Sequence, residues 1–573
     1  MLIENGIETV DTSIPLSSSK SLISIWRKTF LLPMIGCTLA YILCILFSVA
    51  LVFNVAGVYQ NEWWISRKLA WFGKWIPSNL GLAPSDYLSH QKTGYLEFMV
   101  LLACMFAIYG VMAYFVQRNT QSTPVHFHKN LQRLIWFGAI VGGTIYLFTP
   151  AALTSDIYSY ASYGRLLAFY SANPYFVPPS AFPHDAVYSW LYWKDTVTIY
   201  GPVWTAVSAL LSFLSGSGQM GVIFTFRAFA FAAHLLNIAL VAANLRTMRR
   251  SDRVVAVGTL LYAWNPLVLV ESSLGAHNDV FMVTFLLLGL FLCTRAELRG
   301  TFLRARGYIP PLLAFTLATL IKFSAAPAIG VFIIALFCSV LRSSRKEGGR
   351  LSWRPAIVTS LTAGCISGGL ILLLYGPFWV GHSPADIVKS FSSLPSAVES
   401  FNSLLSALSY MNALHDLPPA MLFLLDRRLW NVVTFLAILL PVAIGSIYLW
   451  RAPTARTIAL VTLASLSAFL VVTPWFFAWY LTWIVGLAVV CLPVTTNRFG
   501  RALIAFVLTF SATAFLTYYS TLVGWILLDM HPASASWALR VTCETFGLPL
   551  IVFFVVYRFW PESSVKATIS TNE

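Results

Sequence analysis

The chain has 573 residues, of which 58% are hydrophobic and only 10% are charged. This composition excludes an ordinary soluble globular protein and indicates a polytopic membrane protein. The net charge of +15 does not indicate nucleic-acid binding, because the basic residues are spread over short loops, as the positive-inside rule predicts. The eight cysteines lie mostly in apolar segments, without the spacing of a zinc site, a haem site or a disulfide framework.

The first apolar segments set the expected orientation. A spanning helix needs roughly 20 apolar residues. The first is expected at 29–53, where it would act as an uncleaved anchor, and Arg27 and Lys28 place the N-terminus in the cytoplasm. The loop 54–94 would then lie outside, with an interfacial aromatic helix in "NEWWISRKLAWFGKW". Two further spans, at 95–117 and 134–153, lead back to the outer side.

The segment 203–214 is apolar but short. If it crossed the membrane, the arginine-rich loop 245–253 would face outside, against the positive-inside rule. We therefore predict a re-entrant or half-embedded helix there, and a true span at 222–245. The fold is predicted to be all-α, with about 14 transmembrane helices, re-entrant or interfacial helices in the outer loops, and both termini in the cytoplasm.

The outer loops of this topology contain all the unusual polar clusters. The basic loops alone determine the topology, so this coincidence indicates one shared site on the outer face. These outer loops are poor in Lys and Arg and rich in Trp, Tyr, Pro and His: 271–280, 321–327, 376–428, 473–480 and 520–537.

The stretch "LTSDIYSYASYGRLLAFYSANPYF" (153–176) follows the third span directly. Thr154 or Ser155 could cap a helix, and Asp156 would then simply favour its N-terminal dipole. On that helix Asp156 would share a face with two tyrosines, while Arg165 would point nearly the opposite way. A carboxylate here could instead deprotonate a sugar hydroxyl, and an arginine could hold a phosphate by two hydrogen bonds.

Three further cationic or titratable side chains stand near the outer ends of spans. Arg227 and Lys322 could snorkel to the headgroups, or each could contact a phosphate. In "ESSLGAHND" the turn explains Gly275 and the Asn or Asp, but not His277. His277 and Asp279 could contact a phosphate, a sugar or a divalent ion, although a lone His-x-Asp is weak support for a metal.

Aromatic residues crowd the same level of the chain. They occur in "ANPYFVPP" (172–179), "IYGPVW" (199–204) and "TPWFFAWYLTW" (473–483). Such residues can form the interfacial belt of a membrane protein, and they can equally stack on sugar rings. The sequence leaves both interpretations open.

Together, "SDIYSYASYGRL…NPY…YGP", "GAHND", "IKFSAAP" and "PWFFAWYLTW" resemble GT-C membrane glycosyltransferases. More narrowly, they resemble the bacterial polyprenol-phosphate-mannose-dependent α-1,6-mannosyltransferases over residues 130–490. This resemblance implies a polyprenyl-phosphate-linked sugar donor, transfer on the outer face with inversion, and Asp156 as the base. Two extra spans precede the Asp here. We therefore predict an N-terminal addition (1–130), a catalytic membrane core (131–495) and C-terminal helices with a short tail (496–573).

The predicted function is transfer of a hexose, with mannose first, from a polyprenyl-phosphate donor to a glycan or glycolipid. Asp156 is the predicted catalytic base, and no cofactor is certain, although a divalent metal is possible. The predicted phosphate-binding residues are Arg165, Arg227, His277 and Lys322. The predicted sugar- or acceptor-binding residues are Tyr158, Tyr160, Tyr163, Asn173, Tyr200, Asn278, Asp279, Trp475 and Tyr480.

The sequence is also compatible with two other functions. A polysaccharide polymerase or ligase would use the loop 376–428, which contains His382, His415, Asp416, Arg427 and Arg428. A lipid or sugar transporter would carry charges near mid-membrane and an internal repeat, and the sequence shows neither pattern. The sequence also lacks the P-loop motif for a nucleotide, as expected for a lipid-linked donor.

Overall fold

The computed structural model describes residues 32–49, 84–119, 125–149, 154–348, 351–392, 399–492, 498–518 and 535–559. Within these ranges the regular structure is helical, apart from an isolated β-bridge between Phe401 and Trp475. Nine of the described helices are long and apolar enough to cross a membrane, and the bent pair α10 (Asp252–Ala263) and α11 (Pro266–Ser273) would make a tenth. The predicted all-α polytopic membrane class is confirmed, while the count of about 14 spans remains a prediction.

The remaining α-helices follow in chain order. They are α2 (Leu32–Val49), α5 (Pro84–Asn119), α6 (Val125–Leu147), α7 (Asp156–Tyr170), α8 (Pro202–Ser215), α9 (Gln219–Thr247), α12 (Asp279–Leu298), α13 (Ala305–Ile321), α14 (Ala326–Gly348), α15 (Trp353–Trp379), α16 (Pro384–Ser392), α18 (Leu404–Ala413), α19 (Arg427–Arg451), α20 (Ala455–Val472), α21 (Leu481–Val490), α22 (Arg498–Thr513), α23 (Leu516–Tyr518), α24 (Ala535–Thr542) and α25 (Leu548–Phe559). Short 3₁₀ turns occupy Pro179–Ala181, Tyr188–Trp190, Phe323–Ala325, Pro419–Leu425 and Ala478–Tyr480, and a π-helical turn at Cys543–Gly547 joins α24 to α25.

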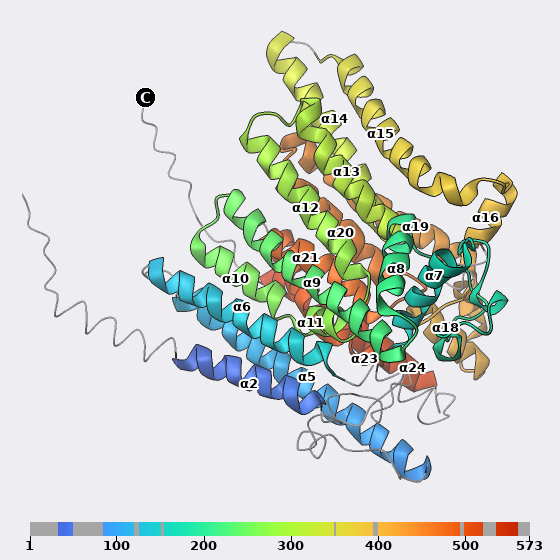
Figure 1. Ribbon diagram of the computed structural model, residues 1–573. Coiled ribbons are helices and arrows are strands. Elements are labelled where there is room, and N and C mark those ends of the chain that lie inside the picture. The colour runs from blue at the N-terminus through green and yellow to red at the C-terminus, as the bar shows by residue number, and fades with distance from the viewer. Residues whose placement is uncertain are drawn as a thin grey trace, which may run out of the picture.

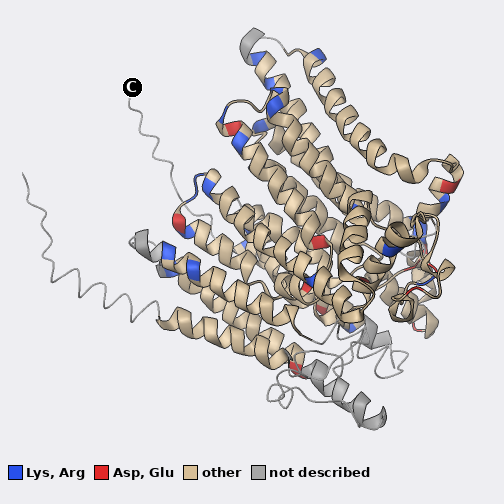
Figure 2. Cartoon of the chain, viewed as in Figure 1, with Lys and Arg blue, Asp and Glu red and all other residues tan. Residues whose placement is uncertain are grey.

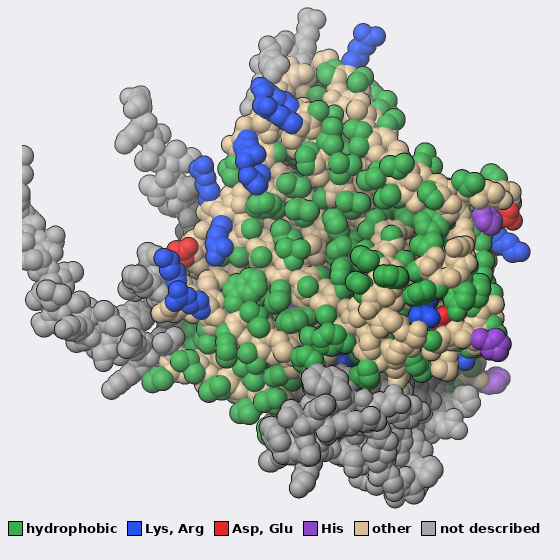
Figure 3. Space-filling view, in the orientation of Figure 1, with side chains coloured by type: hydrophobic (Ala, Val, Ile, Leu, Met, Phe, Trp, Pro, Cys, Tyr) green, Lys and Arg blue, Asp and Glu red, His purple; other side chains and the backbone are tan. Residues whose placement is uncertain are grey.

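The long helices lie side by side in a slanted bundle (Figure 1). Helix α12 is central: it packs against α9, α13, α20 and α21, and 67% of its apolar window is buried. Helices α15 and α19 are peripheral, with only 11% of each window buried. Hydrophobic side chains cover the visible flank of the bundle (Figure 3), as expected for a surface solvated by lipid.

The N-terminal helices α2, α5 and α6 share the hydrophobic core of the rest of the chain. Hydroxyl groups of Tyr41 and Tyr109 donate to the carbonyls of Trp264 and Leu261 at 2.7 and 2.8 Å. The indole of Trp264 in turn donates to the carbonyl of Ile135 at 2.9 Å. The boundary at residue 130 remains a prediction. The predicted interfacial helix within 54–94 and most of the outer loop 520–537 lie outside the described residues.

Basic side chains gather at one end of the bundle. They come from the turns after α9 and α12 and from the last turn of α19, and include Arg249, Arg299 and Arg451. Figure 2 shows Lys and Arg concentrated at these helix ends. Helices α7 and α8 lie at the other end of α9 and α13 (Figure 1). The bundle therefore has a basic end and an opposite end that carries α7 and α8.

Helices α7 and α8 form a close antiparallel pair. Helix α7 begins at Asp156, but Ser155 makes no side-chain capping hydrogen bond, so the predicted cap is not formed. Ser212 of α8 donates to the carbonyl of Ala161 at 2.9 Å. At Gly164 an added Cβ would stand 2.2 Å from the carbonyl oxygen of Ser208. Helix α8 is 14 residues long, which spans only about 21 Å, in keeping with the predicted half-embedded helix.

The close approach of α7 and α8 is testable at Gly164. Gly164→Ala places a methyl group against backbone that cannot rotate away, so we expect a loss of about 1–3 kcal/mol of stability. Thermal unfolding of the purified protein in detergent measures this. Gly110→Ala in α5 is the matched control, because an added Cβ there meets nothing within 4 Å. Equal melting temperatures for the two variants would contradict the close packing.

Candidate active site

Asp156 lines a pocket at the end of the bundle opposite the basic turns. Its side chain is 15% exposed. The pocket is partly open and measures about 560 Å³ when the open space at its mouth is counted. The residues that line it are Asp156, Ser159, Tyr163, Trp193, Thr196, Ile199, Tyr200, Lys322, Trp475, Phe477, Trp479 and Tyr480. Six of the predicted site residues are among them, although they come from three distant parts of the sequence.

The "YGP" segment brings two of these parts together. Gly201 donates its amide to the carbonyl of Ile321 at 3.0 Å, at the end of α13. A Cβ on Gly201 would stand 1.9 Å from the carbonyl oxygen of Leu320, so only glycine allows this approach. Pro202 then starts α8 at a position where proline is favoured. This contact places Tyr200 beside Lys322 in the pocket wall.

Lys322 is the cation of the pocket wall. It follows α13 in an extended conformation, and its side chain is 14% exposed. Its ammonium group lies 2.7 Å from Oδ1 of Asp279 and 4.3 Å from the ring centroid of Tyr480. The indole of Trp483 also donates to Oδ1 of Asp279. Two donors thus meet one oxygen of this buried carboxylate, while Oδ2 of Asp279 has no hydrogen-bond partner among the described residues.

His277 lies behind Asp156 in the loop between α11 and α12. The imidazole is fully buried, and its Nδ1 lies 3.7 Å from Oδ2 of Asp156. Its ring stacks on Trp479 with centroids 4.0 Å apart. On the other side Nε2 lies 3.3 Å from Oε2 of Glu271, which is also buried. The "GAHND" stretch therefore supplies a second layer of side chains beneath the pocket.

Aromatic rings form the rim of the pocket. Phe477 stacks on Trp479 with centroids 4.2 Å apart, and Trp193 and Trp475 are 6.1 Å apart. The late loop reaches this rim, because the amides of Phe401 and Phe476 pair with the carbonyls of Pro474 and Phe401 at 2.8 and 3.0 Å. Flat rings beside a carboxylate and an ammonium group are well suited to a sugar.

Burial changes the acidity of Asp156. The pKa of this carboxyl is raised to about 7, mainly because burial disfavours the charged form. The positive charge of Lys322 acts in the opposite direction, and the negative charge of Asp279 adds to the rise. A carboxyl that titrates near neutrality can accept a proton at that pH and release it again.

Three predicted phosphate ligands do not line the pocket: His277 lies behind Asp156, and the two arginines are held elsewhere. Arg165 donates Nε to both oxygens of Asp185, at 3.0 and 2.9 Å, and Nη1 to the carbonyl of Gly216. Arg227 is fully buried and donates to the carbonyls of Leu274 and Thr149. Both arginines hold segments of backbone or loop together, a use that the sequence pattern does not distinguish from phosphate binding.

Several predicted sugar contacts also lie outside the pocket wall. Tyr158 faces α9 and accepts from Gln219 at 2.8 Å. Asn173 donates to the carbonyl of Phe378 at 2.6 Å and so fastens the "NPY" turn to α15. Tyr160, Asn278 and Asp279 are buried in the layer beneath and do not line the pocket. The hydroxyl of Tyr160 lies 3.4 Å from Nδ1 of His277.

The structure adds residues that the sequence analysis did not assign to the site. Trp193 and Trp479 line the pocket, and Glu271 and Tyr518 lie behind His277. The "TPWFFAWY" motif could have indicated Trp479, and the intramembrane position of Glu271 could have indicated a buried acid. Tyr518 carries no local signal, since it meets Glu271 across 247 residues of sequence.

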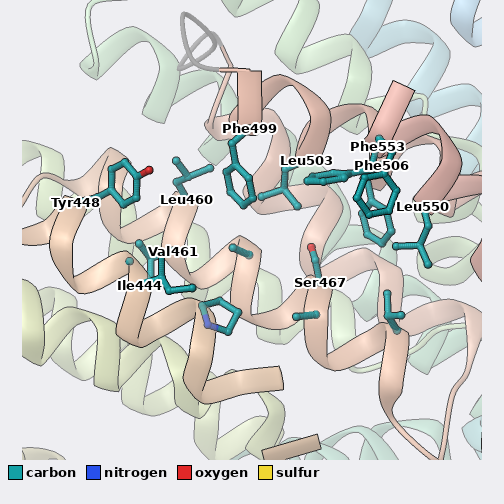
Figure 4. A pocket seen from close by; sticks show the side chains of 16 residues that line it. Ile444, Tyr448, Leu460, Val461, Ser467, Phe499, Leu503, Phe506, Leu550 and Phe553 are labelled. Atoms are coloured by element: carbon teal, nitrogen blue, oxygen red, sulfur yellow. The ribbon is translucent and has the colours of Figure 1, made fainter. Parts of the chain in front are cut away.

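The described residues show neither a metal-binding cluster nor charged groups in their larger pocket. Within the described ranges, no group of three or more His, Cys, Asp or Glu side chains stands close enough to hold a metal ion. A larger pocket of about 1130 Å³ lies between α19, α20, α22 and α25, where Phe499, Phe506 and Phe553 face its interior (Figure 4). Its lining is almost entirely apolar and shares no residue with the Asp156 pocket. The charged groups belong to the smaller pocket.

A family model supports the resemblance that the sequence motifs indicate. The family model described as "Alpha-(1->6)-mannopyranosyltransferase, N-terminal domain" matches residues 69–338, just under half of the chain. This stretch contains Asp156, His277 and Lys322, but not the aromatic rim at 475–480. The predicted resemblance to α-1,6-mannosyltransferases is confirmed.

A curated relative is similar over a shorter stretch. "Alpha-(1->6)-mannopyranosyltransferase B" of Corynebacterium glutamicum is 28% identical over 172 residues. The similar stretch spans 29% of this chain and 26% of the relative. The chain therefore spans about a quarter of the length of the curated relative it matches.

Proposed function

We propose that this chain is an integral-membrane mannosyltransferase. It moves mannose from a polyprenyl-phosphate donor to a hydroxyl group of a glycan or glycolipid, with inversion at the anomeric carbon. The observation that carries the proposal is that a base and a cation, Asp156 and Lys322, line one pocket beside stacked aromatic rings. The family match supports the mannosyltransferase activity, and the apolar helices support the membrane location.

The reaction we propose is a single displacement. Asp156 takes the proton of the acceptor hydroxyl as its oxygen forms a bond to the anomeric carbon. The bond from that carbon to the phosphate oxygen breaks, and its electron pair leaves with polyprenyl phosphate. Lys322 has N–H donors beyond the one directed at Asp279, and these stabilise the charge that develops on the phosphate.

The proposed site faces the outer side of the membrane. Its support is that helix α7, which begins at Asp156, lies away from the basic turns at the other end of the bundle (Figure 1 and Figure 2), since basic loops remain in the cytoplasm. The same rule places both termini in the cytoplasm. The polyprenyl tail of the donor stays in the bilayer beside the apolar flank, while its phosphate reaches the pocket.

The polymerase or ligase alternative has less support. His382 stacks on Phe176 with centroids 3.5 Å apart, and His415 and Asp416 are exposed after α18. None of the five polar residues of the loop 376–428 that this alternative would use lines the Asp156 pocket. The loop instead reaches the rim through Phe401, which suits a part in holding the acceptor.

Loss of the base tests the proposal directly. Asp156→Asn keeps the size of the side chain and removes its basicity, so we expect transfer to fall about 10²- to 10⁴-fold. The assay supplies polyprenyl-phosphate-mannose and a short mannan acceptor to purified protein. Asp386→Asn, at an exposed position on α16, is the control. If wild-type protein transfers no mannose, or if Asp156→Asn matches it, the proposed reaction is wrong.

The pH dependence of transfer follows from the acidity of Asp156. Its pKa is raised to about 7, and only the carboxylate can accept a proton. We therefore expect kcat/KM to rise about tenfold per pH unit below this value and to level off above it. The full profile in detergent checks the direction. A profile that is flat through neutral pH would exclude a base with this acidity.

Removal of the pocket cation should affect the chemical step. For Lys322→Met we expect kcat to fall about 10²- to 10³-fold, the size found when one transition-state donor is lost. Because this change also leaves Asp279 without its cation, Lys322→Met with Asp279→Asn is measured beside it. Recovery of activity in the double variant would mean that Lys322 only neutralises Asp279. Lys389→Met, at an exposed site on α16, is the control.

A further inference from the structure

A row of polar side chains runs from the pocket into the core. It starts at Asp156, passes through both nitrogens of His277, and reaches Glu271. The hydroxyl of Tyr518 then donates to the two oxygens of Glu271 at 2.9 and 3.2 Å. Glu271 and His277 are fully buried, and neither lines the pocket. The proposed reaction needs Asp156, but it does not by itself explain why a second carboxyl lies behind the imidazole.

The surroundings of Glu271 favour a neutral acid. Its side chain is completely shielded from solvent, and within the described residues no lysine or arginine lies at ion-pair distance from it. An ionised carboxylate in such surroundings is costly, whereas the protonated form keeps a hydrogen to donate. Nε2 of His277 has no hydrogen-bond partner among the described residues and lies 3.3 Å from Oε2 of Glu271, so it is an acceptor within reach of the carboxyl proton.

We propose that Glu271 is a positioning residue that acts through His277. As a protonated acid it donates to Nε2, which leaves the ring proton of the neutral imidazole on Nδ1. The Nδ1–H group then points toward Asp156 and holds its carboxylate in the orientation that receives the acceptor proton. This role rests on the proposed function, because Asp156 has to act as the base. No proton is transferred along the row during turnover.

The backbone of the loop is shaped around this pair. Ala276 has φ of +53°, a left-handed conformation that is unfavourable for a residue with a Cβ and persists only where the surroundings impose it. At Gly275 an added Cβ would stand 2.7 Å from Cδ2 of His277 and 2.9 Å from Oε2 of Glu271. Residue 275 therefore has to lack a side chain for the carboxyl and the imidazole to meet.

The ring of His277 is held in place on its face and at its edge. Trp479 stacks on it at an interplanar angle of 11°. Nδ1 lies 3.4 Å from the hydroxyl oxygen of Tyr160 and 3.7 Å from Oδ2 of Asp156. The second distance is too long for a hydrogen bond, and catalytic hydrogen bonds commonly shorten when substrate binds. A shift of less than about 1 Å would bring it into range.

The tautomer of His277 is the first test, and it does not depend on activity. Nitrogen-15 NMR of protein labelled at its nine histidines distinguishes Nδ1–H from Nε2–H, and His277→Asn identifies the signal. We expect Nδ1–H in the wild type and in Glu271→Gln, whose amide can still donate to Nε2. We expect this preference to be lost in Glu271→Leu, which cannot donate. Nε2–H in the wild type, or no change in Glu271→Leu, overturns the proposal.

Transfer kinetics are the second test. In Glu271→Leu we expect kcat to fall about 10- to 100-fold with KM little changed, since a misplaced base slows the chemical step. Glu271→Gln should restore most of the wild-type kcat. Gly275→Ala should resemble Glu271→Leu. If Glu271→Gln is as slow as Glu271→Leu while both keep the wild-type melting temperature, Glu271 acts as a proton acceptor and the positioning role is wrong.

A double-variant comparison separates positioning from general damage to the fold. Asparagine at position 277 can present an amide donor to Asp156 without needing a proton from Glu271. Glu271→Leu should therefore slow the His277→Asn protein by less than about threefold, and an undiminished loss contradicts the proposal. A wild type that transfers no mannose but holds His277 as Nδ1–H would refute the proposed function and leave the tautomer assignment standing.

Discussion

The contact between Gly201 and the end of α13 is the constraint on which the candidate site depends. The amide of Gly201 reaches the carbonyl of Ile321, and the approach leaves no room for a side chain. It fixes the α7–α8 pair, which carries Asp156, against the helix that ends at Lys322. Asp156 and Lys322 therefore line the same pocket although they are 166 positions apart in the sequence. A shift of about 1 Å at this contact would slow the reaction by misplacing the base relative to the cation.

Burial then decides how each ionisable group can be used. Lys322 and Trp483 both donate to one oxygen of Asp279. Arg165 has Asp185 as its partner. Among the described residues Asp156 has no such ion-pair partner. Its side chain is 15% exposed, and its Oδ2 lies 3.7 Å from Nδ1 of His277. The result is one partly exposed carboxyl in the pocket wall, while Asp279 and Arg165 each have a charged partner, a difference expected at a catalytic site.

Much of this could be predicted from the sequence, because the bilayer restricts the possible folds. Apolar length and basic loops indicated the helical class and brought Asp156, His277, Asp279 and Lys322 to one end. The same reasoning could not tell Arg165 and Arg227 from phosphate ligands. Their partners are a loop carboxylate and backbone carbonyls, and such pairings depend on tertiary contacts. The role of Tyr518 could not be predicted for the same reason, since its partner Glu271 is distant in the sequence.

The weak burial of α15 and α19 has a consequence for how this protein tolerates sequence change. Most of their side chains face lipid, and only 11% of each apolar window is buried. Exchanges among Leu, Ile, Val and Phe there alter little but the fit to the surrounding bilayer. The sequences of α15 and α19 can therefore change to suit thicker or thinner membranes. Helix α12 and the segments around Asp156 tolerate less change, because their side chains are tightly packed. Homologues should therefore diverge fastest along this flank.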